Sequence, residues 1–312
     1  MEIIKDSPKK KFLESLRTKR GYKRYLGSPL RYAGGKSAAV GLVVELLPDD
    51  VEVVVSPFIG GGSVEVALAK ELGIKVIAYD IFDVLVNFWQ VLLKRKSELL
   101  DKLSKMNPDK ETYNKVKERL TRHWKFSQYS VGKEEDLITD PVELAALYYF
   151  NHQLSYGPGF LGWPSSVYLN REAYSRFLEK LYYFEAPNLE VYQADFVDSI
   201  PRHKQEFLYL DPPYYLGPDS SVFRGLYPMR NIPVHHEGFP HEKLRDLLRE
   251  HEGGFILHYN DCETIREFYK GYELHTASWH YSMGLGETRI GKYRSAKGKS
   301  KKESKEVIFV KR

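Results

Sequence analysis

The sequence predicts an α/β fold: a mostly parallel sheet with helices on both faces, interrupted by a mostly helical insertion. Short apolar runs alternate with helical patterns from about residue 26 onward. A glycine-rich turn joins the first apolar run to a helix, which gives the strand–helix–strand unit from which parallel sheets are built. Residues 81–185 break this rhythm, because they contain helical patterns and no series of strands.

Composition limits the class of protein. The chain has 312 residues, of which 42% are apolar and 29% charged, as in globular proteins. It contains no apolar run of about 18 residues, so no membrane span is expected. The basic N-terminus lacks the apolar segment of a secretory signal. The single cysteine, Cys262, excludes an internal disulfide and a cysteine-cluster metal site, and we expect a cytoplasmic protein.

Both ends of the chain are basic, and the net charge is +5. Residues 1–25 are interpreted as a basic N-terminal arm with one short helix, and residues 291–305 as a mobile loop before the last strand. Basic arms suit phosphate groups, although a solvated tail is an equally good interpretation of each arm taken alone.

The first strand–helix–strand unit contains a possible ligand site. Residues 51–57 are a predicted strand, 62–73 a helix and 75–80 a second strand. The glycines of "SPFIGGGSVEV" let a ligand approach the backbone at a helix N-terminus. As a bare turn this signal is weak, but Asp80 ends the next strand, where an acid can accept both hydroxyls of a ribose. The glycine turn and Asp80 together suit a single nucleoside better than a dinucleotide.

Helices and then further strands follow. The predicted helices cover residues 81–98, 108–122, 141–152 and 171–184. The predicted strands cover residues 189–195, 206–211, 254–260, 272–279 and 305–311.

The stretch "LYLDPPYY" ends one of these strands. Asp211 follows the buried residues Leu208–Leu210, and two prolines then stop the sheet ladder because neither has a backbone N–H. A carboxylate, rigid carbonyls and aromatic rings are thereby held at the carboxyl end of a strand.

Six motifs in this order resemble those of a known family. They are "LRYAGGKS" (30–37), "PFIGGGS" (57–63), "YDIFDVLVNFW" (79–89), "QADF" (193–196), "DPPY" (211–214) and "HYND" (258–261). The sequence is similar to amino-directed DNA methyltransferases that use S-adenosylmethionine, and most closely to the α-group of adenine-N6 methylases, the Dam-like family. Ser56 departs from the family, which usually has Glu there. "LSYGPGFLGW" (154–163) stands where GATC methylases have an arginine-rich reading segment, which leaves the recognition sequence open.

The resemblance implies a Rossmann-like methyltransferase sheet with one antiparallel strand near the C-terminal end. It implies a catalytic, cofactor-binding domain at 26–98 and 186–312 and an inserted target-recognition domain at 99–185. The implied catalytic residues are Asp211, Pro212, Pro213 and Tyr214. The implied cofactor-binding residues are Tyr32, Lys36, Pro57, Phe58, Gly60, Gly62, Ser63, Asp80, Ile81, Asp195, Phe196 and Asp211.

The chemistry explains why such a site needs these groups. The lone pair of adenine N6 is delocalised into the ring, so the amine is a poor nucleophile. Acceptors at Asp211 and the carbonyl of Pro212 would stabilise the charge that develops as the methyl group arrives. Tyr214 would offer a stacking face to an adenine that has left the helix.

The implied partner is double-stranded DNA. The candidate base-reading residues are Asn151, His152, Gln153, Tyr156 and Arg171, and the candidate phosphate contacts are Lys292, Arg294, Lys297 and Lys299. We expect a monomer, with a cognate restriction endonuclease as an open question. No metal is expected, because His235 and His236 lack a third ligand at suitable spacing.

Two alternatives stay open from the sequence. Cytosine-N4 methylases share the fold, but "SPPY" is their more usual tetrapeptide. RNA and protein methylases of the superfamily generally carry "NPPY", so Asp211 argues against them. A non-catalytic DNA-binding relative would have no reason to keep Lys36, Asp80 and Asp211 together.

Overall fold

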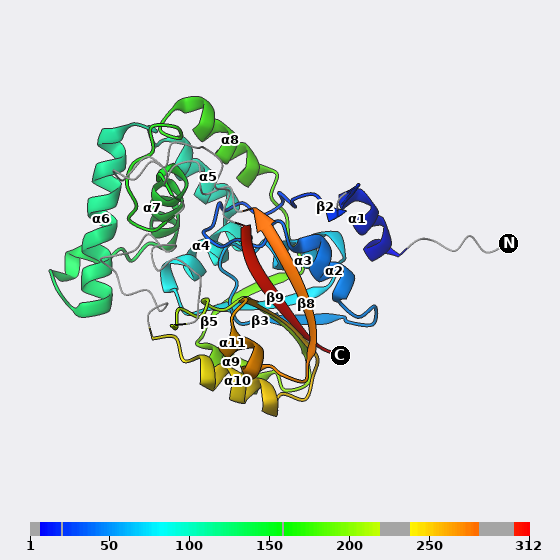
Figure 1. Cartoon of the computed structure of the whole chain (residues 1–312). Coiled ribbons are helices and arrows are strands. Elements are labelled where there is room, and N and C mark those ends of the chain that lie inside the picture. The colour runs from blue at the N-terminus through cyan, green and yellow to red at the C-terminus, as the bar shows by residue number, and fades with distance from the viewer. Residues whose placement is uncertain (1–6, 20, 158, 219–237, 281–302) are drawn as a thin grey trace, which may run out of the picture.

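A seven-stranded sheet lies at the centre of the structure (Figure 1), in the strand order β5-β4-β3-β6-β7-β9-β8. The computed structural model describes residues 7–19, 21–157, 159–218, 238–280 and 303–312. The strands of the sheet are β3 (Val53–Ser56), β4 (Lys75–Asp80), β5 (Leu189–Gln193), β6 (Phe207–Leu210), β7 (Phe255–Asn260), β8 (Glu273–His280) and β9 (Glu303–Lys311).

The sheet is mostly parallel. β3, β4, β5, β6 and β7 pair in parallel, whereas β9 pairs antiparallel with both β7 and β8. The predicted fold class is therefore confirmed, including the single antiparallel strand near the C-terminal end. Each of the seven predicted strands is present within a few residues of its predicted bounds.

Both faces of the sheet are covered, because alternate side chains of each strand point to opposite faces. Val54 of β3 belongs to one hydrophobic core and Val55, the next residue, to the other. The helices around the sheet are α1 (Pro8–Leu16), α2 (Val40–Leu46), α3 (Ser63–Glu71), α4 (Asp83–Lys94), α9 (Phe196–Arg202), α10 (His241–Glu250) and α11 (Glu263–Phe268). The core that contains Val55 is completed by α9, α10 and α11 (Figure 1).

The N-terminal region is packed against the body of the protein from residue 8 onward. Phe12 and Leu16 of α1 are buried in the larger core with residues of α2 and α3. Tyr25 stacks edge-on against Phe12, and its hydroxyl donates a 2.9 Å hydrogen bond to Glu71. A two-stranded ribbon, β1 (Arg17–Thr18) and β2 (Gly21–Tyr22), follows α1. Within its described residues the basic arm is therefore not free of the body.

The segment between α4 and β5 is helical in its described residues. It contains α5 (Lys96–Ser104), α6 (Lys110–Tyr129), the 3-10 helix η1 (Glu134–Asp136), α7 (Pro141–Leu154) and α8 (Arg171–Tyr182). Side-chain caps set three of the helix starts: Asp109 accepts from the backbone N–H of Thr112, Asp140 from Val142 and Asn170 from Ala173.

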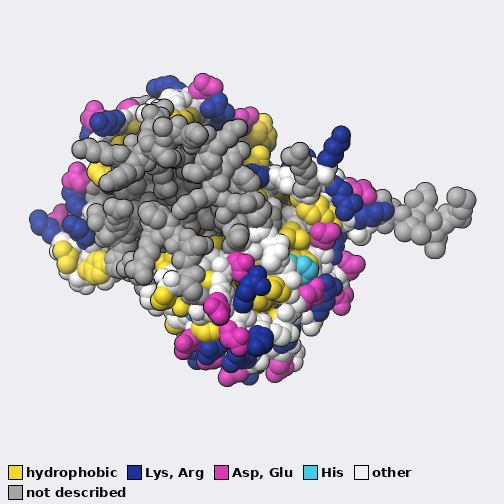
Figure 2. Space-filling model, viewed as in Figure 1, with side chains coloured by type: hydrophobic (Ala, Val, Ile, Leu, Met, Phe, Trp, Pro, Cys, Tyr) yellow, Lys and Arg dark blue, Asp and Glu magenta, His cyan; other side chains and the backbone are white. Residues whose placement is uncertain are grey.

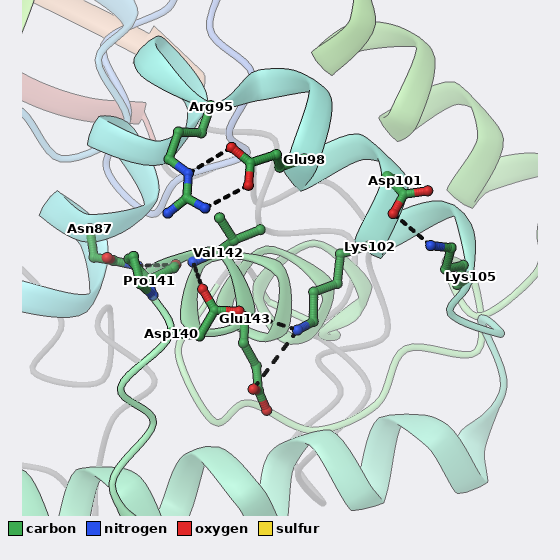
Figure 3. Close-up of polar contacts among 10 residues, drawn as sticks. All are labelled: Asn87, Arg95, Glu98, Asp101, Lys102, Lys105, Asp140, Pro141, Val142 and Glu143. Carbon is green, nitrogen blue, oxygen red and sulfur yellow. Dashed lines mark hydrogen bonds and ion pairs between the residues drawn. The ribbon is translucent and has the colours of Figure 1, made fainter.

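These helices share a core with the sheet domain. Phe88 of α4 stacks on Tyr149 of α7 with ring centroids 5.3 Å apart. At the start of α7, the Asn87 side chain donates to the carbonyl of Pro141, and Lys102 pairs with Asp140 and Glu143 (Figure 3). None of the helices described here is long and apolar enough to cross a membrane.

Candidate active site

The candidate site lies at the carboxyl edge of the sheet, where the strand order reverses. From β3 the chain goes to β4 and β5 on one side, and later returns to β6 and β7 on the other. In open α/β sheets, ligands bind in the crevice at such a switch point. Ser56, Asp80 and Leu210 end the strands β3, β4 and β6, so the glycine turn, Asp80 and Asp211 meet at this edge.

The glycine turn between β3 and α3 requires its glycines. Gly60 and Gly62 have φ angles of +44° and +63°, a region that disfavours side chains. A Cβ on Gly61 would lie 2.5 Å from the Cβ of Tyr32, and Nε1 of Trp89 donates a 3.1 Å hydrogen bond to the carbonyl of Gly60. Tyr32 and Trp89 thus hold the turn at the N-terminus of α3.

Asp80 ties this turn to the next strand. Its Oδ2 accepts a 3.1 Å hydrogen bond from the backbone N–H of Gly60, and its Oδ1 accepts a 3.0 Å bond from that of Phe82. The backbone N–H of Ala194, just after β5, donates to the carbonyl of Asp80. The acid predicted to hold a ribose therefore contacts the glycine turn.

Asp211 forms an ion pair with Lys36. The distance from Lys36 Nζ to Asp211 Oδ1 is 2.7 Å, and the two side chains are 5% and 20% exposed. Lys36 also donates to the carbonyl of Gly34 and lies 4.8 Å from the ring centre of Tyr214. Burial raises the pKa of Asp211 to about 6, although the positive charge of Lys36 opposes this rise. The carboxyl is thus ionised at neutral pH but close to its titration range.

The segment after Asp211 is fixed to β7 by Asn260. The side chain of Asn260 accepts a 2.9 Å hydrogen bond from the backbone N–H of Tyr215 and donates a 3.1 Å bond to its carbonyl. Tyr214 is only 6% exposed. Asn260 was not among the predicted site residues, although it belongs to the weaker motif "HYND".

Three phenylalanines form a ring cluster beside the turn. The ring centres of Phe58 and Phe196 lie 5.6 Å apart, and that of Phe239 lies 5.8 Å and 5.1 Å from them. Asp195 caps α9, because its Oδ1 accepts from the backbone N–H of Val197. Phe58, Asp195 and Phe196 were expected to bind the cofactor, whereas Phe239 carried no motif that could identify it.

A second buried acid lies at the same edge. Glu65, in the first turn of α3, is 2% exposed, and its Oε1 accepts a 2.6 Å hydrogen bond from the hydroxyl of Ser56. Burial raises the pKa of Glu65 to about 8, with a smaller contribution from the negative charge of Asp211. Glu65 was not among the predicted site residues. The sequence signal that could have identified it was Ser56, which stands where the family usually has Glu.

Contacts connect much of the predicted cofactor set. Tyr32 lies against Gly60 and Gly61, Gly60 binds Asp80, and Phe58 packs on Phe196. Lys36 joins Asp211 from a distant part of the chain. Of the other members, Pro57 and Gly62 lie in the turn after β3, Ser63 begins α3, and Ile81 follows β4.

Three of the predicted base-reading side chains are buried. Asn151 accepts a hydrogen bond from the backbone N–H of Leu161, and His152 stacks on Tyr32. Gln153 accepts from Arg31 and donates to the carbonyl of Pro29. The exposed fractions of the three side chains are 2% or less. Packing directs the three side chains inward, where they connect α7 to the segment around residue 30, and their role in base reading stays a prediction.

The remaining DNA candidates divide into two groups. Tyr156 and Arg171 are exposed, as is the neighbouring Trp163 at 78%. Lys292, Arg294, Lys297 and Lys299 lie outside the described residues. Over α10 and α11, Lys and Arg side chains are interspersed with Asp and Glu (Figure 2).

The described residues form no group of three or more His, Cys, Asp and Glu side chains that could hold a metal ion. The carboxyl edge of the sheet instead presents carboxylates, backbone N–H groups of a helix N-terminus and aromatic rings. Such a donor set suits a nucleoside with a charged side arm.

Comparisons with known proteins agree with this geometry. Residues 32–283 match the family described as D12 class N6 adenine-specific DNA methyltransferase. The chain is also 22% identical over 273 residues to the Type II methyltransferase M1.LlaDCHI of Lactococcus lactis subsp. cremoris. That alignment covers 84% of this chain and 91% of the relative.

Proposed function

We propose that this chain transfers the methyl group of S-adenosylmethionine to N6 of an adenine that is flipped out of duplex DNA. The chain belongs to the D12 class N6 adenine-specific DNA methyltransferase family. The observation that carries the proposal is the place of "DPPY" at the carboxyl end of β6, beside the glycine turn and in contact with Lys36.

The residues at this edge fit S-adenosylmethionine. Asp80 accepts one backbone N–H at each oxygen, and a carboxylate placed at the end of β4 is the kind of group that accepts ribose hydroxyls. Phe58, Phe196 and Phe239 provide apolar surface for an adenine ring. When bound, the cofactor would supply an electrophilic methyl group on a sulfonium sulfur.

We assign the catalytic role to Asp211. Its carboxylate and the carbonyl of Pro212 would accept hydrogen bonds from the two N6 hydrogens, which favours a pyramidal amine and stabilises the positive charge that develops on nitrogen. The N6 proton would then pass to Asp211 or to water. Lys36 keeps Asp211 ionised at neutral pH, because a nearby positive charge opposes the effect of burial.

Tyr214 is the proposed stacking surface for the flipped adenine. Its ring is 6% exposed and already lies against Lys36. A flipped base would therefore need a small rearrangement of the segment after Asp211, which the two hydrogen bonds of Asn260 limit.

The helical segment 99–185 is the proposed target-recognition region. Tyr156, Trp163 and Arg171 are its exposed aromatic and basic candidates on or near the loop between α7 and α8. The basic residues 289–302 would contact phosphate groups. Since the relative is a Type II methyltransferase, we propose that this protein is a site-specific modification enzyme whose functional partner is a restriction endonuclease of the same specificity. We also propose that it acts as a monomer, in the compartment that holds the DNA.

The test is to incubate the purified protein with S-adenosylmethionine and unmethylated DNA, followed by nucleoside analysis and modification-sensitive sequencing. We expect N6-methyladenine at one short sequence, and none with Asp211→Ala. N4-methylcytosine would favour the alternative reaction of the same fold. An absence of any methylated base, despite cofactor binding, would support a non-catalytic DNA-binding protein.

A further inference from the structure

Glu65 is a buried acid without a basic partner among the described residues. It is 2% exposed and lies in the first turn of α3, directly after the glycine turn. Its carboxyl accepts a hydrogen bond from the hydroxyl of Ser56 and interacts with the backbone N–H groups of Val64 and of its own residue at the start of α3, none of which carries a full positive charge. Asp211 differs in this respect, because Lys36 compensates its charge at 2.7 Å.

The position of Glu65 assigns it to the candidate active site. Ser56 is the last residue of β3, at the strand's carboxyl end, and Asp211 lies close enough for its charge to raise the pKa of Glu65. Three further ionisable groups of this edge interact with Asp211 or with its partner Lys36, and Asp80 accepts hydrogen bonds from the backbone of Gly60 and Phe82. Lys36 pairs with Asp211, and the negative charge of Glu306 in β9 raises the pKa of Asp211. His258 of β7 is buried near Lys36, and its pKa is lowered.

Packing alone does not explain this carboxyl group. A buried acid is unfavourable unless it is protonated or paired with a cation, and a glutamine would make the same hydrogen bond with Ser56 without that penalty. With a pKa of about 8, Glu65 is mainly protonated in the free protein at neutral pH. A ligand that places a positive charge beside it would favour the ionised form.

S-adenosylmethionine carries two such charges, a sulfonium and an ammonium group. We propose that Glu65 is a cofactor-binding residue that recognises the positive charge of S-adenosylmethionine and releases its proton to solvent when the cofactor binds. This inference rests on the cofactor proposed above, and it assigns the recognition of charge to a residue outside the motifs on which the family resemblance rests.

The proposal is tested by calorimetric titration of S-adenosylmethionine in buffers of different ionisation enthalpy, which measures the protons released on binding. The wild type should release close to one proton more than Glu65→Gln at pH 7, and its affinity should rise with pH up to about 8. The affinity of Glu65→Gln for S-adenosylmethionine should not rise with pH. At pH 8.5 it should be at least tenfold weaker than the wild-type affinity, and at pH 6 the two affinities should be closer.

Glu52→Gln is the matched control. Glu52 is exposed just before β3, at the end of that strand opposite to Ser56, so the variant makes the same carboxyl-to-amide change away from the site. Its affinity and proton release should equal those of the wild type. Ser56→Ala provides a test that does not depend on the folding of Glu65→Gln. The hydrogen bond from Ser56 lowers the pKa of Glu65, so its loss should move the rise in affinity to higher pH.

Two further ligands identify the charge that Glu65 recognises. S-adenosylhomocysteine retains the ammonium group but not the sulfonium, and 5′-methylthioadenosine has neither. If the wild type releases more protons than Glu65→Gln only with S-adenosylmethionine, Glu65 recognises the sulfonium. If it does so with both S-adenosylmethionine and S-adenosylhomocysteine, Glu65 recognises the ammonium group. Equal release with 5′-methylthioadenosine would overturn the proposal.

The outcomes separate this proposal from the proposed function. If the wild type binds S-adenosylmethionine and Glu65→Gln shows the same affinity and proton release, the role of Glu65 is refuted and the function stands. If the folded wild type binds no S-adenosylmethionine, the proposed cofactor is refuted, and the role of Glu65 with it.

Discussion

The carboxyl edge of the sheet and the helical segment α5–α8 use charged side chains in opposite ways. At the sheet edge the charged groups are largely buried, and each contacts either another charge or the backbone, as Lys36 does with Asp211 and Asp80 with Gly60. Along the helices the charged groups pair at the surface: Lys102 lies 3.5 Å from Asp140, and both side chains are at least 40% exposed (Figure 3).

This difference has an energetic consequence. Electrostatic interactions are strong where water is excluded and weak where it is not, so the same substitution should matter far more at the edge. The helices are instead attached through aromatic packing, such as that of Phe88 on Tyr149. Charged side chains are thus buried and paired at the proposed active site and exposed to water along the helices.

The largest expected effect is that of Asp211→Asn. The amide preserves the shape of the side chain but loses the negative charge, so single-turnover methylation should fall by about a thousandfold or more. Cofactor affinity should stay within about tenfold, because the role of Asp211 is in the transition state. Asp246→Asn, on the surface of α10, is the control and should leave both quantities unchanged. Substantial activity in Asp211→Asn would remove the distinction between the two regions.

Asp80→Asn should have the second largest effect. Both carboxylate oxygens accept backbone hydrogen bonds; the amide oxygen of Asn could accept one of them, but its amide nitrogen cannot accept the other. We expect about a hundredfold weaker binding of S-adenosylmethionine and a loss of about 1–3 kcal/mol in the free energy of unfolding. Calorimetry and urea denaturation measure the two quantities.

Asp109→Asn makes the same chemical change at the start of α6. Asp109 uses one oxygen as a helix cap, and Asn caps about as well as Asp. Its stability and cofactor affinity should therefore remain close to those of the wild type. Equal losses in Asp80→Asn and Asp109→Asn would show that the edge is no more sensitive than the helices.

The pH dependence of methylation should follow Asp211. Its pKa is raised to about 6, so lowering the pH through 6 protonates the carboxyl and removes the acceptor. The single-turnover rate with saturating cofactor and DNA should fall about tenfold per pH unit below 6 and be nearly constant above it. A rate that is constant down to pH 5 would contradict the assignment of Asp211 as the titrating acceptor.

The smallest effect is expected for Lys102→Met in the helical segment. The pairs of Lys102 with Asp140 and Glu143 are solvent-exposed and 3.5 Å and 3.8 Å long, so their loss should change the free energy of unfolding by less than about 1 kcal/mol. Added salt should reduce that difference further. Urea denaturation at low and high salt measures it, and a loss of several kcal/mol would show that these pairs anchor α7.

The strands and the motif residues could be predicted from sequence because their signals are local. Apolar runs such as 206–211 and the prolines after Asp211 define where a strand ends, whatever the rest of the chain does. Several helices were not assigned from the sequence. The six or seven residues of α2, α9 and α11 carry little periodicity, and α9 includes Pro201. The ten-residue α10 and most of α5 were also missed.

The sequence by itself therefore determined the succession of the seven sheet strands along the chain, the acids at the strand ends and the family, because each of these signals lies within a short run of residues. Tertiary structure alone decided which distant groups meet: Lys36 with Asp211, and Asn260 with Tyr215. It also decided that Asn151 and Gln153 face inward and that Glu65 is buried without a basic partner in the described chain. Burial and pairing depend on packing between remote segments, and they set the pKa values on which the proposed chemistry depends.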